Sequence, residues 1–343
     1  MHTKLDNLLK GADAVLLTSS HNMQYFSGFS GGEGAVLITN DSQIVYTDSR
    51  YTEAAQQEVE GFQVIETNNW MSEIEDFGSI VFEDEEISAA EHEILKDALG
   101  KTKLLPGSAE LKKLRMVKTE AELKKIAEAE ALACHAFEYV LGIIRPGLRE
   151  FELAAELEYY MKKNGGEGTS FDTIAISGAR TSLPHGVPTD KKIESGDFVT
   201  LDFGCKIGGC CSDMTRTVVV GKATAKQKKI YNTVKSAQQA GLDFIREGVS
   251  GKDADASARE VIENAGYGEY FRHSLGHGVG LLVHELPNLS PKSAIILAEN
   301  MVVSCEPGIY IPEFGGVRIE DLVVVKKDGC INLTPATKEL IEI

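Results

Sequence analysis

Residues 315–325, GGVRIEDLVVV, carry three charged side chains inside an otherwise apolar run near the C-terminus. Successive residues of a β-strand point to opposite faces, so Val317 and Ile319 share one face while Arg318 and Glu320 share the other. A carboxylate that folding buries needs a partner. A chain with this run therefore has to supply positive charge at one face of a buried strand, and Arg318 is one candidate for it.

A second pair of acids, Asp202 and Asp213, lies in FVTLDFGCKIGGCCSDMTRTVVV, residues 198–220. If the two acids are cross-strand partners in a hairpin, the loop consists of Ile207 and Gly208. Like charges directly opposite one another destabilise a sheet, so this pairing requires a cation between them or a raised pKa on one of them. The alternative is two solvated acids on an open sheet face, which the apolar flanking runs disfavour.

Four of the eight histidines occur between residues 185 and 284, in the short phrases LPHGVP, FRHSLGHGVG and LVHELP. They are His185, His273, His277 and His284. An ordinary core or surface role is the simpler interpretation for any single one. Four together, near several isolated carboxylates, indicate a functional site.

Two further acids have a similar setting, since Glu306 follows an apolar run in VVSCEPGIY and Glu320 lies in the C-terminal run. With Asp202, Asp213 and His277 they provide four carboxylates and one imidazole. Such a set suits two divalent ions, Mn²⁺, Co²⁺ or Zn²⁺, if some carboxylates bridge them. A pair of ions polarises a carbonyl group and generates a hydroxide nucleophile at neutral pH.

The length of 343 residues favours two domains. Residues 12–115 alternate apolar runs such as AVLLTS, GAVLITN and QIVYTDS with helical patterns, which is typical of an α/β arrangement. A capping box at Thr119 and Glu122 begins a long helix. Further helices at about 225–246 and 252–265 accompany a glycine-rich, strand-rich region, which predicts an α+β domain. We therefore expect domains at 1–115 and 116–343.

The formal net charge of −17 at pH 7 disfavours nucleic acid and anionic membranes as partners. The N-terminal residues contain acids and no long apolar run, so neither a secretory signal nor a membrane span is expected, and we predict a cytoplasmic protein. Six cysteines in a chain of this size are interpreted as reduced thiols.

Six phrases in order, SFDTIAISGARTSLPHG, GDFVTLDFG, SDMTRT, GHGVGLLVHELP, EPGIYIP and GGVRIEDLVVV, resemble the metallopeptidases of the pita-bread fold. The resemblance is closest to the Xaa-Pro aminopeptidases (aminopeptidase P) and prolidases. YFSGFSGGEG and YTDSRYTEAA are similar to the smaller N-terminal domain of those enzymes. The resemblance implies a C-terminal pita-bread, creatinase/aminopeptidase-like catalytic domain after a smaller α/β creatinase-type domain, and a homodimer.

The same resemblance implies a role for each matching residue. The ligands of two metal ions, with Mn²⁺ preferred and Co²⁺ or Zn²⁺ as alternatives, would be Asp202, Asp213, His277, Glu306 and Glu320. His185, His273 and His284 would line the substrate site and shuttle or donate protons. Arg318 would support the acidic cluster beside the ions.

The expected reaction is hydrolysis of the peptide bond before proline in a proline-containing peptide, as in an Xaa-Pro aminopeptidase. A prolidase restricted to dipeptides is the main alternative, and a catalytically inactive binding module of the same fold is a remote one. Methionine aminopeptidases resemble SDMTRT and GGVRIEDL less well, and creatine-cleaving relatives lack the metal ligands. A helical H-E-x-x-H protease is excluded because Leu-Pro follows His284 and Glu285.

The chain departs from the family pattern at Cys210, where relatives often have tyrosine. Cys205, Cys210 and Cys211 therefore lie near the predicted metal hairpin, either as small buried residues or as a soft, redox-sensitive ligand set. Trp70 and Arg50 are weaker candidates for reaching the active site of a neighbouring subunit.

Overall fold

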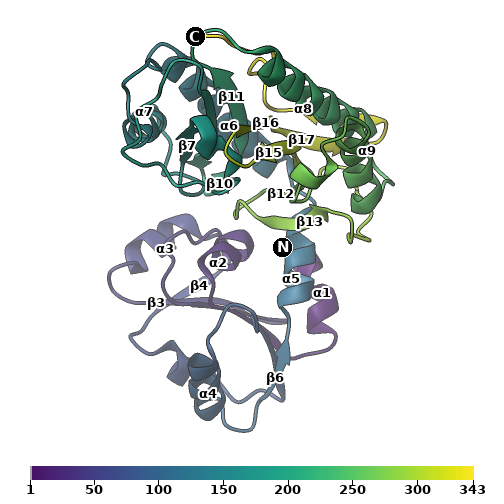
Figure 1. The fold of residues 1–343 in the computed structure, drawn as a ribbon. Coiled ribbons are helices and arrows are strands. Elements are labelled where there is room, and N and C mark those ends of the chain that lie inside the picture. The colour runs from purple at the N-terminus through teal and green to yellow at the C-terminus, as the bar shows by residue number, and fades with distance from the viewer. Residues whose placement is uncertain (1) are drawn as a thin grey trace. The chain divides into compact units, whose positions relative to one another are not determined.

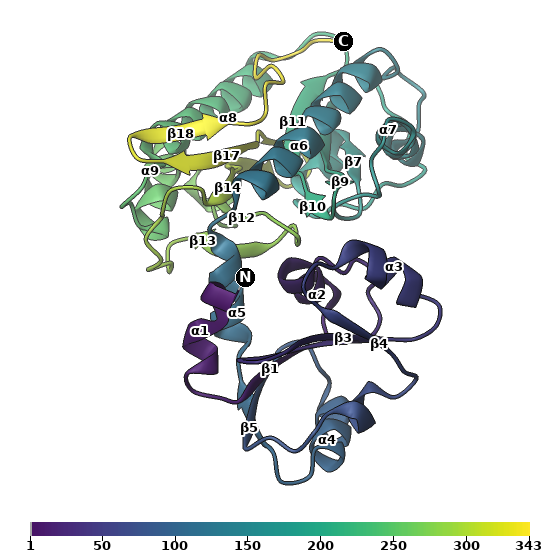
Figure 2. The ribbon, with the colours of Figure 1, turned by 180° about the vertical axis from the view of Figure 1, so that it is seen from behind.

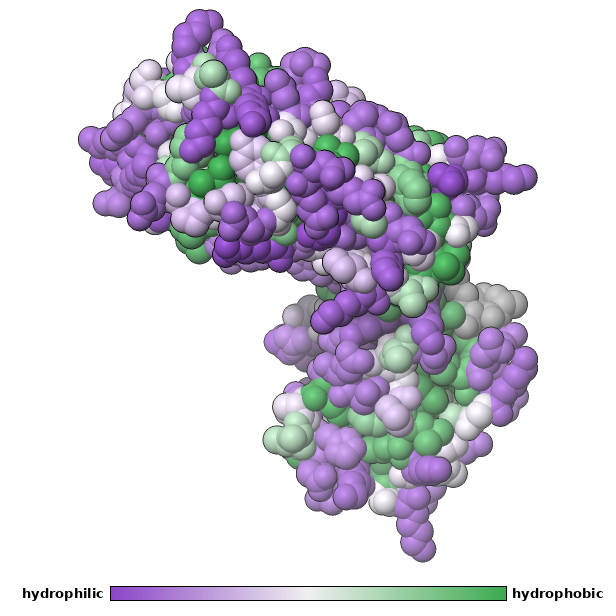
Figure 3. All heavy atoms as spheres, turned by 45° about the vertical axis from the view of Figure 1, so that its right-hand side comes forward, coloured by the Kyte–Doolittle hydropathy of each residue, from purple (hydrophilic) through white to green (hydrophobic). Residues whose placement is uncertain are grey.

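The computed structural model describes residues 2–343, which form two compact units. The first unit ends at Arg115 and the second spans Met116–Ile343. Figures 1 and 2 show the ribbon from opposite sides. Hydrophilic residues cover much of the face in view in Figure 3, with smaller apolar areas among them. Among the described residues, no helix is both long enough and apolar enough to cross a membrane.

The first unit is built on a six-stranded mixed sheet in the order β4-β3-β2-β1-β5-β6. Its strands are β1 Ala14–Leu17, β2 Ala35–Thr39, β3 Gln43–Thr47, β4 Gln63–Glu66, β5 Ser79–Phe82 and β6 Lys103–Pro106. Its helices are α1 His2–Leu9, α2 Ser20–Ser27, α3 Thr52–Glu58, α4 Ala89–Ala98 and α5 Ser108–Met116. The runs AVLLTS, GAVLITN and QIVYTDS are thus confirmed as strands.

Alternation along β1 explains why both faces of this sheet are covered. Val15 packs with Leu5 of α1 and Leu111 of α5, together with residues of α2 and α3. Leu16 points the other way and packs with Leu95 of α4. Because every residue of β1 is buried, the strand is continuously apolar, as expected for a strand covered on both faces.

The second unit places four α-helices outside its two larger sheets. The helices are α6 Glu120–Leu141, α7 Glu150–Lys163, α8 Ala225–Phe244 and α9 Gly251–Asn264. The three-stranded sheet β11-β8-β7 contains β7 Ile174–Ser177, β8 Phe198–Phe203 and β11 Met214–Val219. The five-stranded sheet β13-β12-β14-β17-β18 contains β12 Gly276–Gly278, β13 Glu285–Leu289, β14 Val302–Cys305, β17 Asp321–Lys326 and β18 Gly329–Asn332.

The two larger of the three buried clusters in this unit join these layers. Helices α6 and α7 pack on the three-stranded sheet, for example Phe137 and Leu157 with Leu201. Helices α8 and α9 pack on the five-stranded sheet through residues such as Val234 and Val323, and Figure 1 shows both helices beside β17. Figure 2 shows α6 from the other side. The predicted α+β class is confirmed.

Helix α6 begins as its sequence indicates. The Glu122 N–H donates to Thr119 Oγ1 at 3.3 Å, and the Thr119 N–H donates to Glu122 Oε2 at 2.9 Å. The capping box therefore satisfies donors that the first helical turn leaves free.

The predicted pairing of Asp202 with Asp213 is wrong. Asp202 lies opposite Thr215 in the β8–β11 ladder, and Ile207 lies opposite Cys210 between β9 Lys206–Ile207 and β10 Cys210–Cys211. The turn consists of Gly208 and Gly209, whose φ angles are 57° and 78°. A tight hairpin needs left-handed backbone at both central residues, which two glycines adopt without the steric cost of a side chain.

The run GGVRIEDLVVV forms two strands instead of one. Strand β16, Gly315–Arg318, pairs with β15, Gly308–Ile311, whereas β17 pairs with β14. Glu320 lies in the connection, where it forms an isolated bridge with Thr215. The change of partner brings the carboxylate to the junction between the sheets.

Candidate metal centre

The nine predicted site residues line one cavity of about 560 Å³ in the second unit. They are His185, Asp202, Asp213, His273, His277, His284, Glu306, Arg318 and Glu320. These residues come from several strands and loops over more than a hundred positions of the chain. The structure therefore brings together every site residue that the sequence analysis selected.

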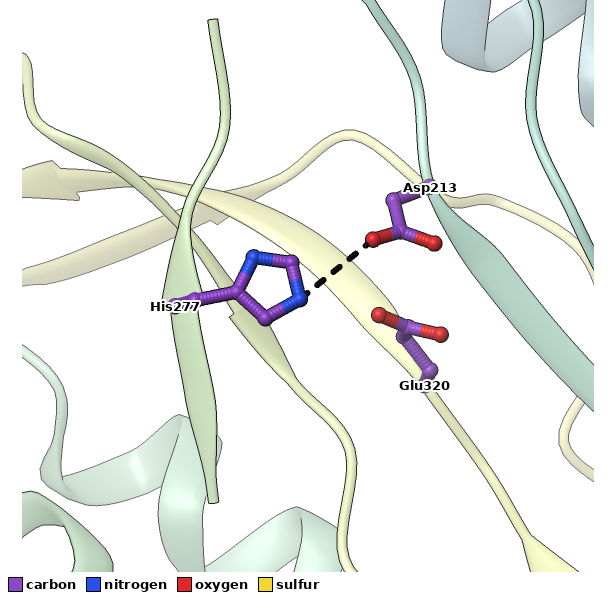
Figure 4. Close-up of side chains that lie close together, drawn as sticks. All are labelled: Asp213, His277 and Glu320. Carbon is purple, nitrogen blue, oxygen red and sulfur yellow. Dashed lines mark ion pairs between the residues drawn. The ribbon is translucent and has the colours of Figure 1, made fainter. Parts of the chain in front are cut away.

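Three of these side chains form the centre of the cluster. Asp213 directly precedes β11, His277 lies in β12 and Glu320 directly precedes β17. One ligand atom from each lies within 4.8 Å of the others, and Figure 4 shows the three side chains pointing toward one another. The distance from His277 Nε2 to Asp213 Oδ2 is 3.6 Å.

The orientation of His277 leaves Nε2 directed at the carboxylates. Its Nδ1 lies 3.2 Å from the Gly278 carbonyl oxygen, which can only accept a hydrogen bond. Nε2 lies 3.2 Å from Glu306 Oε1, and Ser304 Oγ donates to the same oxygen at 3.1 Å. A backbone acceptor on one imidazole nitrogen is the usual way to fix the other nitrogen as a metal ligand.

The burial and the mutual repulsion of the carboxylates favour a bound cation between them. Burial, followed by the charges of neighbouring carboxylates, raises the pKa values of Asp213 and Glu320 well above their usual range. Asp202 Oδ1 and Glu320 Oε1 are buried and have no hydrogen-bond partner among residues 2–343. Oxygen donors with open lone pairs beside one imidazole fit divalent metal ions, so the residues present fit the metal centre that the sequence predicted.

Arg318 is buried and engaged on all three of its nitrogens. Nε donates to Thr215 Oγ1 at 3.1 Å, one terminal nitrogen donates to Tyr310 Oη at 2.7 Å, and the other donates to Asp202. These bonds hold Asp202 beside the cluster. Arg318 therefore has an acidic side chain of the cavity as a direct hydrogen-bond partner.

Tyr310 is a site residue that the sequence analysis did not select. Its hydroxyl lies 2.8 Å from Nε2 of His273, whose Nδ1 lies 2.8 Å from the Ser274 carbonyl oxygen. Since Nδ1 must donate to that carbonyl, Nε2 accepts from the tyrosine hydroxyl. In the phrase EPGIYIP the residue counts as one more apolar position, so a hydrophobic pattern hides its hydroxyl.

His185 and His284 are the exposed histidines of the lining. The His284 ring lies edge-on to His277, with centroids 4.4 Å apart. Burial and the charge of His277 lower the pKa of His284. Both exposed imidazoles are accessible to a molecule that enters the cavity.

Asp321, the third charge of the opening run, belongs to a different cluster. It is fully buried, and its carboxylate accepts from Arg216 at 2.7 Å, Lys338 at 2.8 Å and Asn332 at 2.6 Å. Burial raises the pKa of Asp321, but the charges of Arg216 and Lys338 outweigh this effect and lower it. In the charged run, Arg318 and Glu320 thus line the cavity, whereas Asp321 forms a buried ion pair away from it.

The cysteines near the hairpin do not line the cavity. Cys205, Cys210 and Cys211 are buried free thiols. Burial raises the pKa values of Cys205 and Cys210 to about 12, which keeps them protonated at neutral pH. This environment favours the interpretation of small apolar residues.

Comparisons with known proteins agree with this architecture. Residues 124–327 match the model of Metallopeptidase family M24, and residues 4–117 match the Creatinase/Prolidase N-terminal domain. A protein of Pyrococcus horikoshii named Xaa-Pro dipeptidase is 41% identical, covering 96% of this chain and 94% of that protein.

Two solved structures are similar over nearly their full lengths. The Xaa-Pro dipeptidase from Bacillus anthracis has a TM-score of 0.96 at 42% identity, covering 99% of this chain and 98% of that one. The X-Pro aminopeptidase from Thermotoga maritima has a TM-score of 0.91 at 39% identity, covering 98% of this chain and 99% of that one.

Proposed function

Because this chain belongs to metallopeptidase family M24 and carries a creatinase/prolidase N-terminal domain, we propose that it hydrolyses the peptide bond before proline in Xaa-Pro dipeptides. Family membership makes it a metal-dependent exopeptidase that acts on a peptide substrate. The observation that carries the proposal is the convergence of four carboxylates and His277 in one cavity that three further histidines line.

The proposed ligand set is Asp202, Asp213, His277, Glu306 and Glu320, holding two divalent ions, with Mn²⁺ as the preferred metal. Divalent ions polarise a bound carbonyl and make water nucleophilic at neutral pH. Arg318 orients Asp202 within this set through its hydrogen bond to that carboxylate. Ser304 orients Glu306 in the same way.

The protein side chains then account for binding and proton movement. Apolar lining residues, including Ile174, Val187 and Val283, contact the proline ring. The tertiary amide before proline has no N–H, so the cavity needs no acceptor there. His284 donates a hydrogen bond to the peptide oxygen as negative charge develops on it. The Glu306 carboxylate receives a proton from the attacking water and transfers it to the proline nitrogen as the C–N bond breaks.

We propose a dipeptidase here in place of the aminopeptidase that the sequence analysis expected. The relatives from Pyrococcus horikoshii and Bacillus anthracis are named Xaa-Pro dipeptidases. A dipeptidase must bind the free carboxylate of proline, and Arg318 is already committed to internal partners. In this proposal the exposed imidazole of His185 is a donor in the lining for that carboxylate, while His284 serves the peptide oxygen.

The test compares Ala-Pro with Ala-Pro-Ala, using metal-free protein reloaded with Mn²⁺. We expect kcat/KM to be at least about tenfold higher for the dipeptide, because the tripeptide leaves the carboxylate donors unpaired. The Asp213→Asn variant should lose both bound ions and turnover, whereas Asp190→Asn, at an exposed position outside the lining, should keep both. Full turnover by Asp213→Asn would reject the ligand set.

An Xaa-Pro aminopeptidase is the second candidate, favoured by the similarity to the Thermotoga maritima enzyme. A preference for Ala-Pro-Ala in the same assay would support this candidate and reject the dipeptidase.

Three further features stay predictions. They are Mn²⁺ as the physiological metal, assembly into a homodimer and a cytoplasmic location. Metal analysis of protein purified without chelator, light scattering of the eluted protein and cell fractionation test them in turn.

A further inference from the structure

Glu130 on α6 is a buried carboxylate that lies outside the cavity lining. Its exposed fraction is 0%, and it accepts two hydrogen bonds. Oε2 accepts from the Asp213 backbone N–H at 3.1 Å, and Oε1 accepts from Thr334 Oγ1 at 2.6 Å. Burial of a glutamate at this depth is costly, so its two bonds have to compensate for that cost.

Thr334 extends the hydrogen-bond path from Glu130 toward Glu320, the other proposed ligand. It follows β18 and is 2% exposed. Its hydroxyl oxygen accepts from the Leu322 backbone N–H at 2.8 Å while its proton goes to Glu130. Leu322 is two residues beyond Glu320. An unbroken path of hydrogen bonds therefore joins the backbone beside Glu320 to the backbone of Asp213 without using either ligand carboxylate.

The carbonyl oxygen and the carboxylate of Glu320 itself are held by other residues. Arg216 donates to the Glu320 carbonyl oxygen at 2.5 Å and to the Thr215 carbonyl oxygen at 3.0 Å. The Thr215 hydroxyl donates to Glu320 Oε2 at 2.6 Å. With Glu320 held in this way, the path through Thr334 and Glu130 sets the position of Asp213 relative to it.

We propose that Glu130 and Thr334 are positioning residues that fix the separation of Asp213 and Glu320 for metal binding. The inference rests on the proposed function, because it takes these two carboxylates as metal ligands. Metal–ligand distances in well-formed sites lie within about 0.2 Å of their usual values, so the positions of the ligand side chains matter. Loss of an outer hydrogen-bond partner lowers metal affinity about 10–100-fold in comparable sites.

Isothermal titration of metal-free protein with MnCl₂ tests the proposal in four variants. Thr334→Val removes the hydroxyl at nearly constant volume, and Thr334→Ser restores it. Glu130→Gln replaces one acceptor with an amide donor. Thr47→Val is the control, because Thr47 is also 2% exposed and loses a bond of its hydroxyl to the Glu33 carbonyl oxygen, in the first unit. Melting temperatures in EDTA measure the general loss of stability.

We expect Thr334→Val and Glu130→Gln to weaken Mn²⁺ binding by at least about tenfold, with Thr334→Ser and Thr47→Val near the wild-type affinity. Wild-type affinity in both Thr334→Val and Glu130→Gln, with only a lower melting temperature, would overturn the inference and leave the proposed function standing. If Thr334→Val does not fold, Glu130→Gln decides the result: weaker Mn²⁺ binding supports the inference and wild-type affinity overturns it. A wild-type protein that binds no divalent ion would overturn the proposed function and this inference together.

Discussion

The hydroxyl of Tyr310 lies between Arg318, which bonds the acidic cluster, and His273, which lines the cavity. It accepts a hydrogen bond from buried Arg318 and donates one to His273. The same guanidinium holds Asp202. One oxygen atom therefore influences both an acidic side chain of the proposed metal site and an imidazole of the lining.

At this scale we predict the effect of Tyr310→Phe. The change leaves a donor of Arg318 without its partner in a buried position, so the free energy of unfolding should fall by about 1.5–3 kcal/mol. The kcat/KM for Ala-Pro should also fall, because Arg318 and His273 both lose an orienting contact. Urea denaturation and steady-state kinetics measure the two effects.

Tyr139→Phe is the matched control, since the Tyr139 hydroxyl bonds Glu156 at the surface. That variant should stay within about 0.5 kcal/mol of the wild-type stability. Equal stability of the Tyr310→Phe variant and the wild type would show that the buried contact contributes nothing.

At the scale of elements, the β9–β10 hairpin shows where sequence patterns fall short. A two-residue loop at Ile207 and Gly208 would make Asp202 and Asp213 face each other, yet the Gly208–Gly209 turn shifts the register so that Asp202 faces Thr215. A turn can be placed at either of two neighbouring dipeptides with little change in the apolar pattern. The left-handed backbone requirement decides between them.

Substitutions of Gly208 test this account of the turn. At φ 57°, alanine should lower the free energy of unfolding by about 1–2 kcal/mol, because the left-handed region is strained for a residue with a Cβ; the flexible Lys125 side chain, which that Cβ would also meet, has to move for alanine and asparagine alike. Asparagine should cost less, since it adopts that region more readily. Gly329→Ala, where a Cβ meets nothing within 4 Å, is the control for a glycine without this constraint. Denaturant titration ranks the three variants, and equal losses for alanine and asparagine would contradict the account.

For the whole molecule, metal binding and folding stability should be coupled. The cavity gathers the four proposed ligand carboxylates near buried Arg318, so a cation that binds only the folded state stabilises that state by mass action. Mn²⁺ at 100 times its dissociation constant should add about 2.7 kcal/mol to the free energy of unfolding.

Thermal unfolding with EDTA and with increasing Mn²⁺ measures this coupling. The melting temperature of the wild type should rise with Mn²⁺, while that of Asp213→Asn should not respond. A wild-type melting temperature that is independent of Mn²⁺ would contradict the predicted metal centre.

The sequence by itself determined the features that depend on neighbours along the chain. The capping box at Thr119 and the apolar strands of the first unit were predicted from short phrases, and nine of the residues that line the cavity were selected from such phrases and from their resemblance to known metallopeptidases. The spacing of apolar residues along the sequence indicates which side chains of a strand or helix are buried. It can be read without knowing how the elements pack together.

Only the tertiary structure decided which buried polar groups meet. Thr334 and Glu130 are 204 positions apart, yet they share a hydrogen bond behind the proposed metal site. The apolar pattern around Tyr310 gave no sign of its polar contacts. The same pattern did not show that the charged run divides into β16 and β17. Such partners depend on how sheets and helices pack together, and residue spacing carries no record of that packing.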